Sequence, residues 1–258
     1  MSNYNLIIKI LLYAAVFLTL TCTVGLIVLA VLPTPSAPSD DGGQVPSAPV
    51  VNNTVTLENV TLPQSTDAGE AYLEKIFFVG DSTTLHFNKA DIDPSHILVP
   101  NSLTLMLSSD ILTVLVTDAQ VSIPAALKNA NAEIVIITVG VNGADGFSEL
   151  SYKTYYKKLI NAIKQESPDT KIILQSVFPV EYSFSEKDNG ISNESINKLN
   201  EWAKQIAVDC SARYLDTQSI LKGEDGAMLP KYSEGDGVHM NAAAYEKIVE
   251  YIRTHAID

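Results

Sequence analysis

Residues 133–143 read EIVIITVGVNG, an apolar run followed by a turn that contains glycine and asparagine. A short, nearly continuous apolar run bounded by turn residues is typical of a strand that is covered on both faces. Such strands occur mostly in parallel sheets, whose helical connections lie on the faces of the sheet. The segment therefore predicts a buried strand of an α/β domain.

Four other apolar runs lie on either side of this segment and predict further strands: residues 75–79, 96–99, 171–177 and 213–215. Between the runs, apolar residues recur three and four positions apart, which predicts helices that each bury one face. The three apolar faces consist of Tyr152, Tyr156, Leu159 and Ile163; of Ile196, Leu199, Ala203, Ile206 and Cys210; and of Tyr245, Ile248, Val249 and Ile252. Residues 112–123 break this alternation and predict a hairpin that turns near Asp118. The alternation as a whole predicts a three-layer α/β fold.

The chain of 258 residues has no charged residue from position 10 to position 32. As a helix this segment would be about 35 Å long, enough to cross a bilayer. The alternatives are a buried core helix, a cleaved signal peptide and a lipoprotein signal that uses Cys22. The apolar run is longer than that of a signal peptide and continues beyond Cys22, so we predict an uncleaved transmembrane anchor.

Basic residues near the anchor predict its orientation. Lys9 precedes the anchor and the next basic residue is Lys75, which places residues 1–9 in the cytoplasm and the rest outside. Residues 33–71 are polar, with five prolines in their first half, and predict an extracellular linker. Residues 72–258 then form one domain. The expected location is the cell membrane, single-pass, with this domain on the outside.

The composition excludes several other classes of protein. Acidic residues outnumber basic ones by 30 to 17, for a formal net charge of −13, which disfavours binding to nucleic acid or to anionic lipid headgroups. The two cysteines, Cys22 and Cys210, exclude a disulfide framework and a cysteine-based zinc site.

Polar residues follow two of the predicted strands. Gly80-Asp81-Ser82 comes directly after residues 75–79. A serine in a strand-to-helix turn carries its hydroxyl above the sheet edge, with its backbone N–H toward a developing oxyanion. Gly140-Val141-Asn142-Gly143 follows the strongest strand, where the asparagine amide could donate to the same oxyanion. Taken singly, the first segment could be an ordinary helix cap and the second an ordinary turn.

A third candidate segment, Asp236-Gly237-Val238-His239, precedes the last predicted helix. A spacing of three residues within one turn lets the carboxylate of Asp236 reach Nδ1 of His239. The imidazole Nε2 is then free to take a proton from a serine. Catalytic groups of parallel sheets lie beyond the carboxyl ends of the strands, so the three segments are expected to meet there.

In their order and spacing the three segments resemble the SGNH/GDSL hydrolase superfamily. The resemblance covers residues 75 to about 255 and implies a flavodoxin-like α/β/α domain with five parallel strands. It implies Ser82 as nucleophile and oxyanion donor, Asn142 as a second donor, Asp236 as orienting acid and His239 as base. It also implies ester hydrolysis without a metal or other cofactor.

Two positions depart from the family pattern. The family has a glycine after the second strand, where this chain has Val99-Pro100-Asn101-Ser102, so the N–H of Asn101 or Ser102 is the expected third oxyanion donor. The family's Gly-x-Asn-Asp reads Gly-Val-Asn-Gly here. We further expect His86, Gly140 and Tyr232 to line the substrate site.

The expected function is that of a tethered serine esterase outside the cell. A domain held near the membrane by a linker meets envelope glycans first, and many extracellular relatives remove acetyl groups from carbohydrate. The sequence therefore predicts hydrolysis of O-acetyl esters on cell-wall or surface polysaccharide, in a bacterium by resemblance. The alternatives are a lysophospholipase or thioesterase on the same scaffold, and a carbohydrate-binding protein with a weak active site.

Overall fold

The structure is a computed structural model that describes residues 54–100, 113–116, 119–187 and 190–257. Among these residues, no helix combines the length and the apolar character that a membrane span requires. The predicted anchor at 10–32 lies outside the described residues, as do most of the predicted linker and both Asn101 and Ser102.

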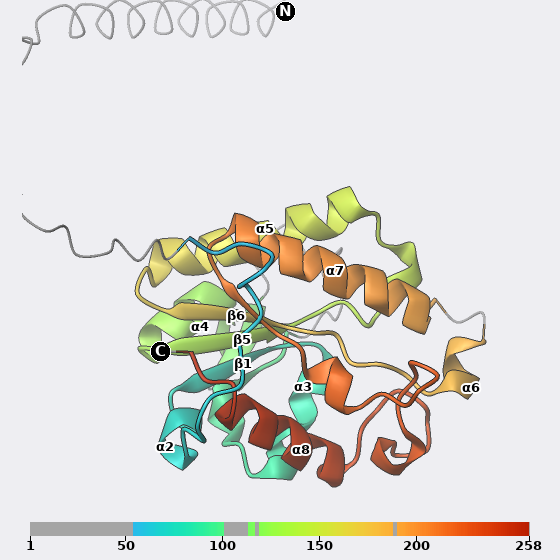
Figure 1. The fold of residues 1–258 in the computed structure, drawn as a ribbon. Helices are drawn as coiled ribbons and strands as arrows, with labels where there is room; N and C mark the ends of the chain where they lie inside the picture. Colours follow the sequence, from blue (N-terminus) through green and yellow to red (C-terminus); the bar gives the residue numbers. More distant parts are fainter. Residues whose placement is uncertain (1–53, 101–112, 117–118, 188–189, 258) are drawn as a thin grey trace, which may run out of the picture. The chain divides into compact units, whose positions relative to one another are not determined.

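The domain is built on a parallel five-stranded sheet in the order β2-β1-β5-β6-β7 (Figure 1). Its strands are β1 (Ile76–Gly80), β2 (Ile97–Leu98), β5 (Ile134–Thr138), β6 (Lys171–Gln175) and β7 (Arg213–Leu215). All five residues of β5 are buried, and β5 lies at the centre of the sheet. The prediction of a parallel α/β sheet around residues 133–139 is therefore confirmed.

Helices cover both faces of the sheet, as Figure 1 shows. One face carries α4 (Ile123–Asn129), α5 (Glu149–Glu166) and α7 (Asn193–Asp209), and the other carries α8 (Ala242–Arg253). Alternate residues of β5 face opposite layers, because Val135 packs with the first set and Ile136 with α8. The three predicted apolar helix faces are thus the inner faces of α5, α7 and α8.

Shorter elements complete the domain. Strands β3 (Thr113–Val116) and β4 (Ala119–Ser122) pair antiparallel, which confirms the hairpin predicted at residues 112–123. The short helices are α2 (Glu70–Leu73), α3 (Ser82–Leu85) and α6 (Tyr182–Ser185), and single 3-10 turns lie at His86–Ala90, Pro94–His96, Ala144–Gly146, Thr217–Ile220 and Pro230–Tyr232.

The domain begins earlier than the predicted boundary at residue 72. Val60 and Leu62 are buried, and the backbone between them pairs with β7. Leu62 N–H donates to Tyr214 O at 2.8 Å, and Tyr214 N–H donates to Val60 O at 2.9 Å. The polar composition of this stretch predicted a linker, but two well-spaced apolar side chains are enough to dock it on the sheet.

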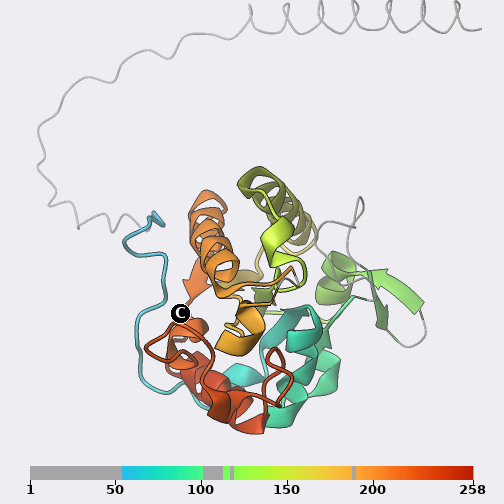
Figure 2. The same ribbon diagram turned by 90° about the vertical axis from the view of Figure 1, so that its right-hand side faces the viewer.

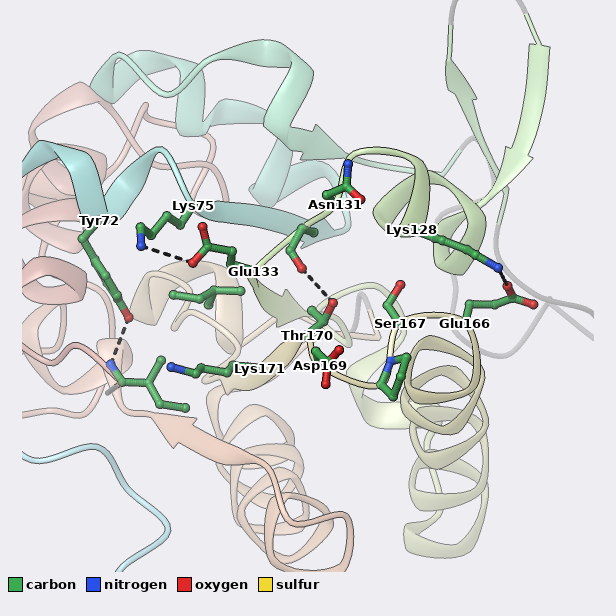
Figure 3. A pocket seen from close by; sticks show the side chains of 14 residues that line it. Tyr72, Lys75, Lys128, Asn131, Glu133, Glu166, Ser167, Asp169, Thr170 and Lys171 are labelled. Carbon is green, nitrogen blue, oxygen red and sulfur yellow. Dashed lines mark hydrogen bonds and ion pairs between the residues drawn. The ribbon is translucent and has the colours of Figure 1, made fainter.

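A polar hollow of about 560 Å³ lies at the amino ends of the central strands (Figure 3). Lys75 pairs with Glu133 at 3.2 Å, and Lys128 pairs with Glu166 at 2.9 Å. Two of its lysines are thus neutralised by carboxylates of the same hollow. The hollow lies at the opposite end of the strands from the turn that carries Ser82.

Candidate active site

Ser82 is the first residue of α3 and follows the tight turn at Asp81, which ends β1. This turn lies at the carboxyl edge of the sheet, the edge that faces the viewer in Figure 2. Asp81 caps α3, and its carboxylate accepts the Thr83 N–H at 3.1 Å. Ser82 is half-buried, so its hydroxyl lies at the domain surface rather than inside the core. This is the placement that the sequence predicted for a nucleophile.

His239 bridges Ser82 and Asp236. Its Nδ1 lies 2.6 Å from Asp236 Oδ2, and its Nε2 lies 3.4 Å from Ser82 Oγ. The contact with Asp236 assigns a proton to Nδ1, which leaves Nε2 as an acceptor for the serine proton. The distance to Ser82 is long for a hydrogen bond, but such contacts commonly tighten when substrate binds. The structure therefore brings together the three residues predicted as the triad.

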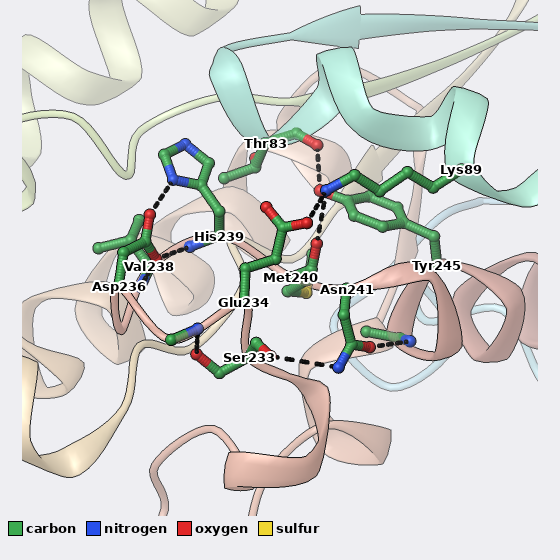
Figure 4. Close-up of polar contacts among 12 residues, drawn as sticks. Thr83, Lys89, Ser233, Glu234, Asp236, Val238, His239, Met240, Asn241 and Tyr245 are labelled. Carbon is green, nitrogen blue, oxygen red and sulfur yellow. Dashed lines mark hydrogen bonds and ion pairs between the residues drawn. The ribbon is translucent and has the colours of Figure 1, made fainter.

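The Asp236 carboxylate is held in its charged form by its neighbours (Figure 4). Partial burial raises its pKa, but the His239 side chain and the N–H groups of Val238 and His239 outweigh burial and lower the pKa to about 2. The two backbone N–H groups donate to Oδ1 at 2.9 and 2.8 Å. Asp236 is therefore ionised at neutral pH and can stabilise a protonated imidazole.

Gly237 allows the sharp turn of the loop between Asp236 and His239. Its φ is +89°, and a Cβ atom there would lie 2.8 Å from Cβ of Phe184. Glu181 N–H donates to Gly237 O at 2.8 Å. Because Gly237 has no side chain, the segment around α6 can pack directly against it and hold Asp236 and His239 in place.

Two asparagines of α7 fix the segment that leads from β6 to α6. The Asn200 side chain bonds both the N–H and the carbonyl of Val177, at 2.7 and 3.0 Å. The Asn193 side chain does the same at Val180, at 3.0 and 2.9 Å. Each amide thus takes the place of a neighbouring strand, and the segment reaches Gly237 in a defined position.

Asn142 lies in the turn after β5, and Asp81 connects this turn to the serine turn. The Asp81 side chain is only 4% exposed and accepts the N–H groups of Gly140 and Val141 as well as that of Thr83. Sequence reasoning missed this connection, because it offered for this segment only the roles of a nucleophile turn or an ordinary helix cap. The Gly140 N–H thus points to the Asp81 carboxylate. The contact of Gly140 with substrate stays a prediction.

Replacing Asp81 with asparagine is expected to disturb both turns. Burial raises the pKa of the Asp81 carboxyl, whereas the hydrogen bonds from Thr83, Gly140 and Val141 oppose this rise. An amide has one acceptor oxygen in place of two, and its NH₂ group would face N–H donors. We expect a loss of about 1–3 kcal/mol of stability, measured by urea unfolding, and about a tenfold or greater loss of kcat with p-nitrophenyl acetate.

The matched control is Asp209→Asn, which removes a carboxylate that pairs with Lys157 at 2.7 Å at the far end of α7. Activity that falls equally in both variants, or in neither, would contradict a role for Asp81 in joining the two turns.

The remaining predicted site residues are placed as follows. The His86 ring packs edge-on against the His239 ring, with centroids 5.5 Å apart. Burial, then the charges of Lys89 and His239, lower the pKa of His86. Asp236 bonds His239 and not His86, so His86 lines the site beside the candidate base.

Tyr232 packs against the core beneath α8, and its carbonyl accepts the Asn241 N–H at 2.9 Å. Within the described part of the chain, no three His, Cys, Asp or Glu side chains cluster as metal ligands.

Comparison with known proteins identifies the family. The profile of the GDSL-like lipase/acylhydrolase family matches residues 78–247. The chain belongs to this family. The matched range contains Ser82, Asn142, Asp236 and His239, and with them all three segments on which the resemblance was based.

Individual relatives of this GDSL protein are distant. A multidomain esterase from Ruminococcus flavefaciens is 26% identical over 129 residues, which are 48% of this chain and 16% of that protein. The chain thus spans under a fifth of the length of that curated relative.

Several solved structures share the fold, and two of them are described here. A protein from Streptococcus pneumonia, described as a platelet activating factor, aligns with a TM-score of 0.51 at 16% identity, over 76% of this chain and 94% of that one. The periplasmic domain of a Salmonella ser. Paratyphi A lipopolysaccharide acetyltransferase aligns with a TM-score of 0.50 at 17% identity, over 69% and 81%. At these identities the likeness supports the α/β fold alone.

Proposed function

We propose that this chain is a serine esterase that removes small acyl groups, acetyl above all, from carbohydrate at the outer side of a cell membrane. The observation that carries the proposal is the line of contacts from Asp236 through His239 to Ser82 at the carboxyl edge of the sheet. This line joins an ionised acid, an oriented imidazole and a surface hydroxyl, which are the parts of a serine hydrolase.

The first half of the reaction forms an acyl-enzyme. Ser82 Oγ attacks the ester carbonyl carbon while His239 Nε2 takes the hydroxyl proton. Negative charge develops on the carbonyl oxygen, and the Ser82 N–H and the Asn142 amide donate to it. When the tetrahedral intermediate collapses, the alcohol leaves with the proton that His239 held, and the acyl group stays on Ser82.

The second half releases the acid. A water molecule gives its proton to His239 and attacks the acyl carbon, and Ser82 leaves with that proton. Asp236 stays ionised throughout, because its role is to hold the imidazole and stabilise the imidazolium charge. The N–H of Asn101 or Ser102, outside the described residues, is proposed as the third oxyanion donor.

The charge around the site favours a neutral substrate. Glu234 and Asp236 are exposed carboxylates close to the candidate base, and the half-buried Glu181 lies beside Gly237. The whole chain carries a net charge of −13. These negative charges repel fatty acids and anionic phospholipids, but they do not oppose the binding of an uncharged acetylated sugar. The predicted anchor at residues 10–32 and the tether after it would hold the enzyme near envelope glycans.

The test is a comparison of acyl chain length and carrier. We expect the full chain in detergent to hydrolyse p-nitrophenyl acetate with kcat/KM at least about tenfold above that for the octanoate ester, because the proposed substrate is an acetyl ester. It should also release acetate from O-acetylated polysaccharide.

A preference for octanoate or for lysophospholipid would instead support the lipase or thioesterase alternative. Retention of the polysaccharide without any turnover of small esters would support the carbohydrate-binding alternative.

A further inference from the structure

Lys89 connects the segment that carries Ser82 to the loop that carries His239. It lies in the 3-10 turn His86–Ala90, directly after α3. Figure 4 shows its side chain reaching across to Glu234 and Met240. Lys89 Nζ donates to Glu234 Oε1 at 2.5 Å and to Met240 O at 3.1 Å. These partners are 145 and 151 residues away in sequence.

The two contacts of Lys89 lie on either side of His239. Met240 follows it directly, and Glu234 N–H donates to His239 O at 2.9 Å. The Lys89 ammonium therefore holds both ends of the short stretch that carries the candidate base. The Lys89 side chain is 23% exposed against 41% for Glu234, so the pair is partly shielded from water.

Tyr245 makes a second contact between these parts of the chain. Lys89 Nζ lies 5.8 Å from the centre of the Tyr245 ring, and the Tyr245 hydroxyl donates to Thr83 O at 2.5 Å. Thr83 is the residue next to Ser82, whereas Tyr245 belongs to α8, which follows the histidine loop. The segment that carries Ser82 is thus joined to the histidine loop at Lys89, and to the helix that follows this loop at Tyr245 (Figure 4).

We propose that Lys89 is a positioning residue that sets the distance between Ser82 Oγ and His239 Nε2. The inference rests on the proposed function, because it assigns Lys89 a purpose only if these two atoms exchange a proton. The stretch from Glu234 to Met240 is irregular and contains two glycines with positive φ, Gly235 and Gly237, so it depends on side-chain contacts for its position. A displacement of about 1 Å at a reacting pair can cost about 10² in rate.

The central variant is Lys89→Met, which keeps the length of the side chain and removes its charge and its donors. We expect kcat for p-nitrophenyl acetate to fall about 10- to 100-fold, with KM within about twofold of wild type. The rate at which a fluorophosphonate labels Ser82 should fall by the same factor, since labelling also needs the serine proton to reach His239. Lys89→Arg, which keeps a cationic donor, should recover most of the rate.

Glu234→Ala tests the same contact from its exposed side and is the second variant should Lys89→Met fail to fold. We expect a smaller loss of kcat, because the bond from Lys89 to Met240 remains. In the Glu234→Ala background, Lys89→Met should cost less than it does in the wild type, as required of two residues that act through one contact. Strictly independent losses would contradict the proposal.

The matched control is Lys128→Met, which breaks the ion pair with Glu166 at 2.9 Å in the hollow of Figure 3. It removes the same chemical group far from Ser82 and should leave kcat unchanged. The proposal is overturned if Lys89→Met keeps kcat within twofold of wild type, or if Lys128→Met loses as much. Activity that survives Ser82→Ala would instead overturn the proposed function, so the two failures are distinguishable.

Discussion

Ser82→Ala is expected to lower kcat for p-nitrophenyl acetate by about 10⁴- to 10⁶-fold, because the substitution removes the proposed nucleophile. The fold should be unaffected, since Ser82 is only half-buried and alanine is well tolerated in the first turn of a helix. His239→Ala should lose a similar factor. The double variant should be no worse than either single one, because residues that act as a unit are not additive. Steady-state kinetics with purified protein measures all three.

Ser219→Ala is the control for the serine series, as its hydroxyl is exposed and donates to Asp216 O at 2.8 Å. Its activity should match the wild type. If Ser82→Ala keeps more than a tenth of the wild-type rate, Ser82 is not the nucleophile. The hydrolysis would then have to be assigned to another group.

Gly80→Ala is expected to destabilise the domain by about 3 kcal/mol or more, at the upper end of the usual range for overpacking. A Cβ atom at Gly80 would lie 1.9 Å from Thr84 Oγ1 and 2.3 Å from Thr138 O. The threonine side chain could rotate away, but Thr138 O belongs to the backbone of β5, which pairs with β1 at this point. Relief therefore requires the two central strands to move apart. Urea unfolding followed by the fluorescence of Trp202 measures the loss.

Gly146→Ala is the matched control, because a Cβ atom there would meet nothing within 4 Å. It should change the free energy of unfolding by less than about 0.5 kcal/mol. Equal stability of the two variants would show that β1 and β5 can part at little cost. It would also remove the structural reason for a glycine before Asp81.

The central sheet was predictable because its strands are short apolar runs and its helices bury regular stripes. Ser82, Asp236 and His239 were predictable for a related reason, since each lies beside an element that the pattern of apolar residues places at one edge of the sheet. The structure then adds the distances that bring the three side chains together. The substrate, the location and the third oxyanion donor stay predictions.

Other features left no local signal in the sequence. Lys89 and Glu234 are 145 residues apart, and neither neighbourhood distinguishes them from ordinary surface charges. The side chain of Asp81 could cap α3 without reaching any other segment, and only the fold shows that it also binds the turn of Asn142. The docking of Val60 and Leu62 depends on the exposed side of β7, which no pattern within residues 33–71 could reveal.

The segment around Val60 and Leu62 also covers part of an open edge of the sheet. A strand at the edge of a sheet presents unpaired N–H and carbonyl groups, and these can recruit a strand from another chain. Here the backbone of residues 60–62 occupies part of the outer side of β7 through its bonds with Tyr214. A fragment that began at residue 72 would leave that edge open to self-association. Residues 60–62 are thus expected to protect this edge of the sheet against aggregation.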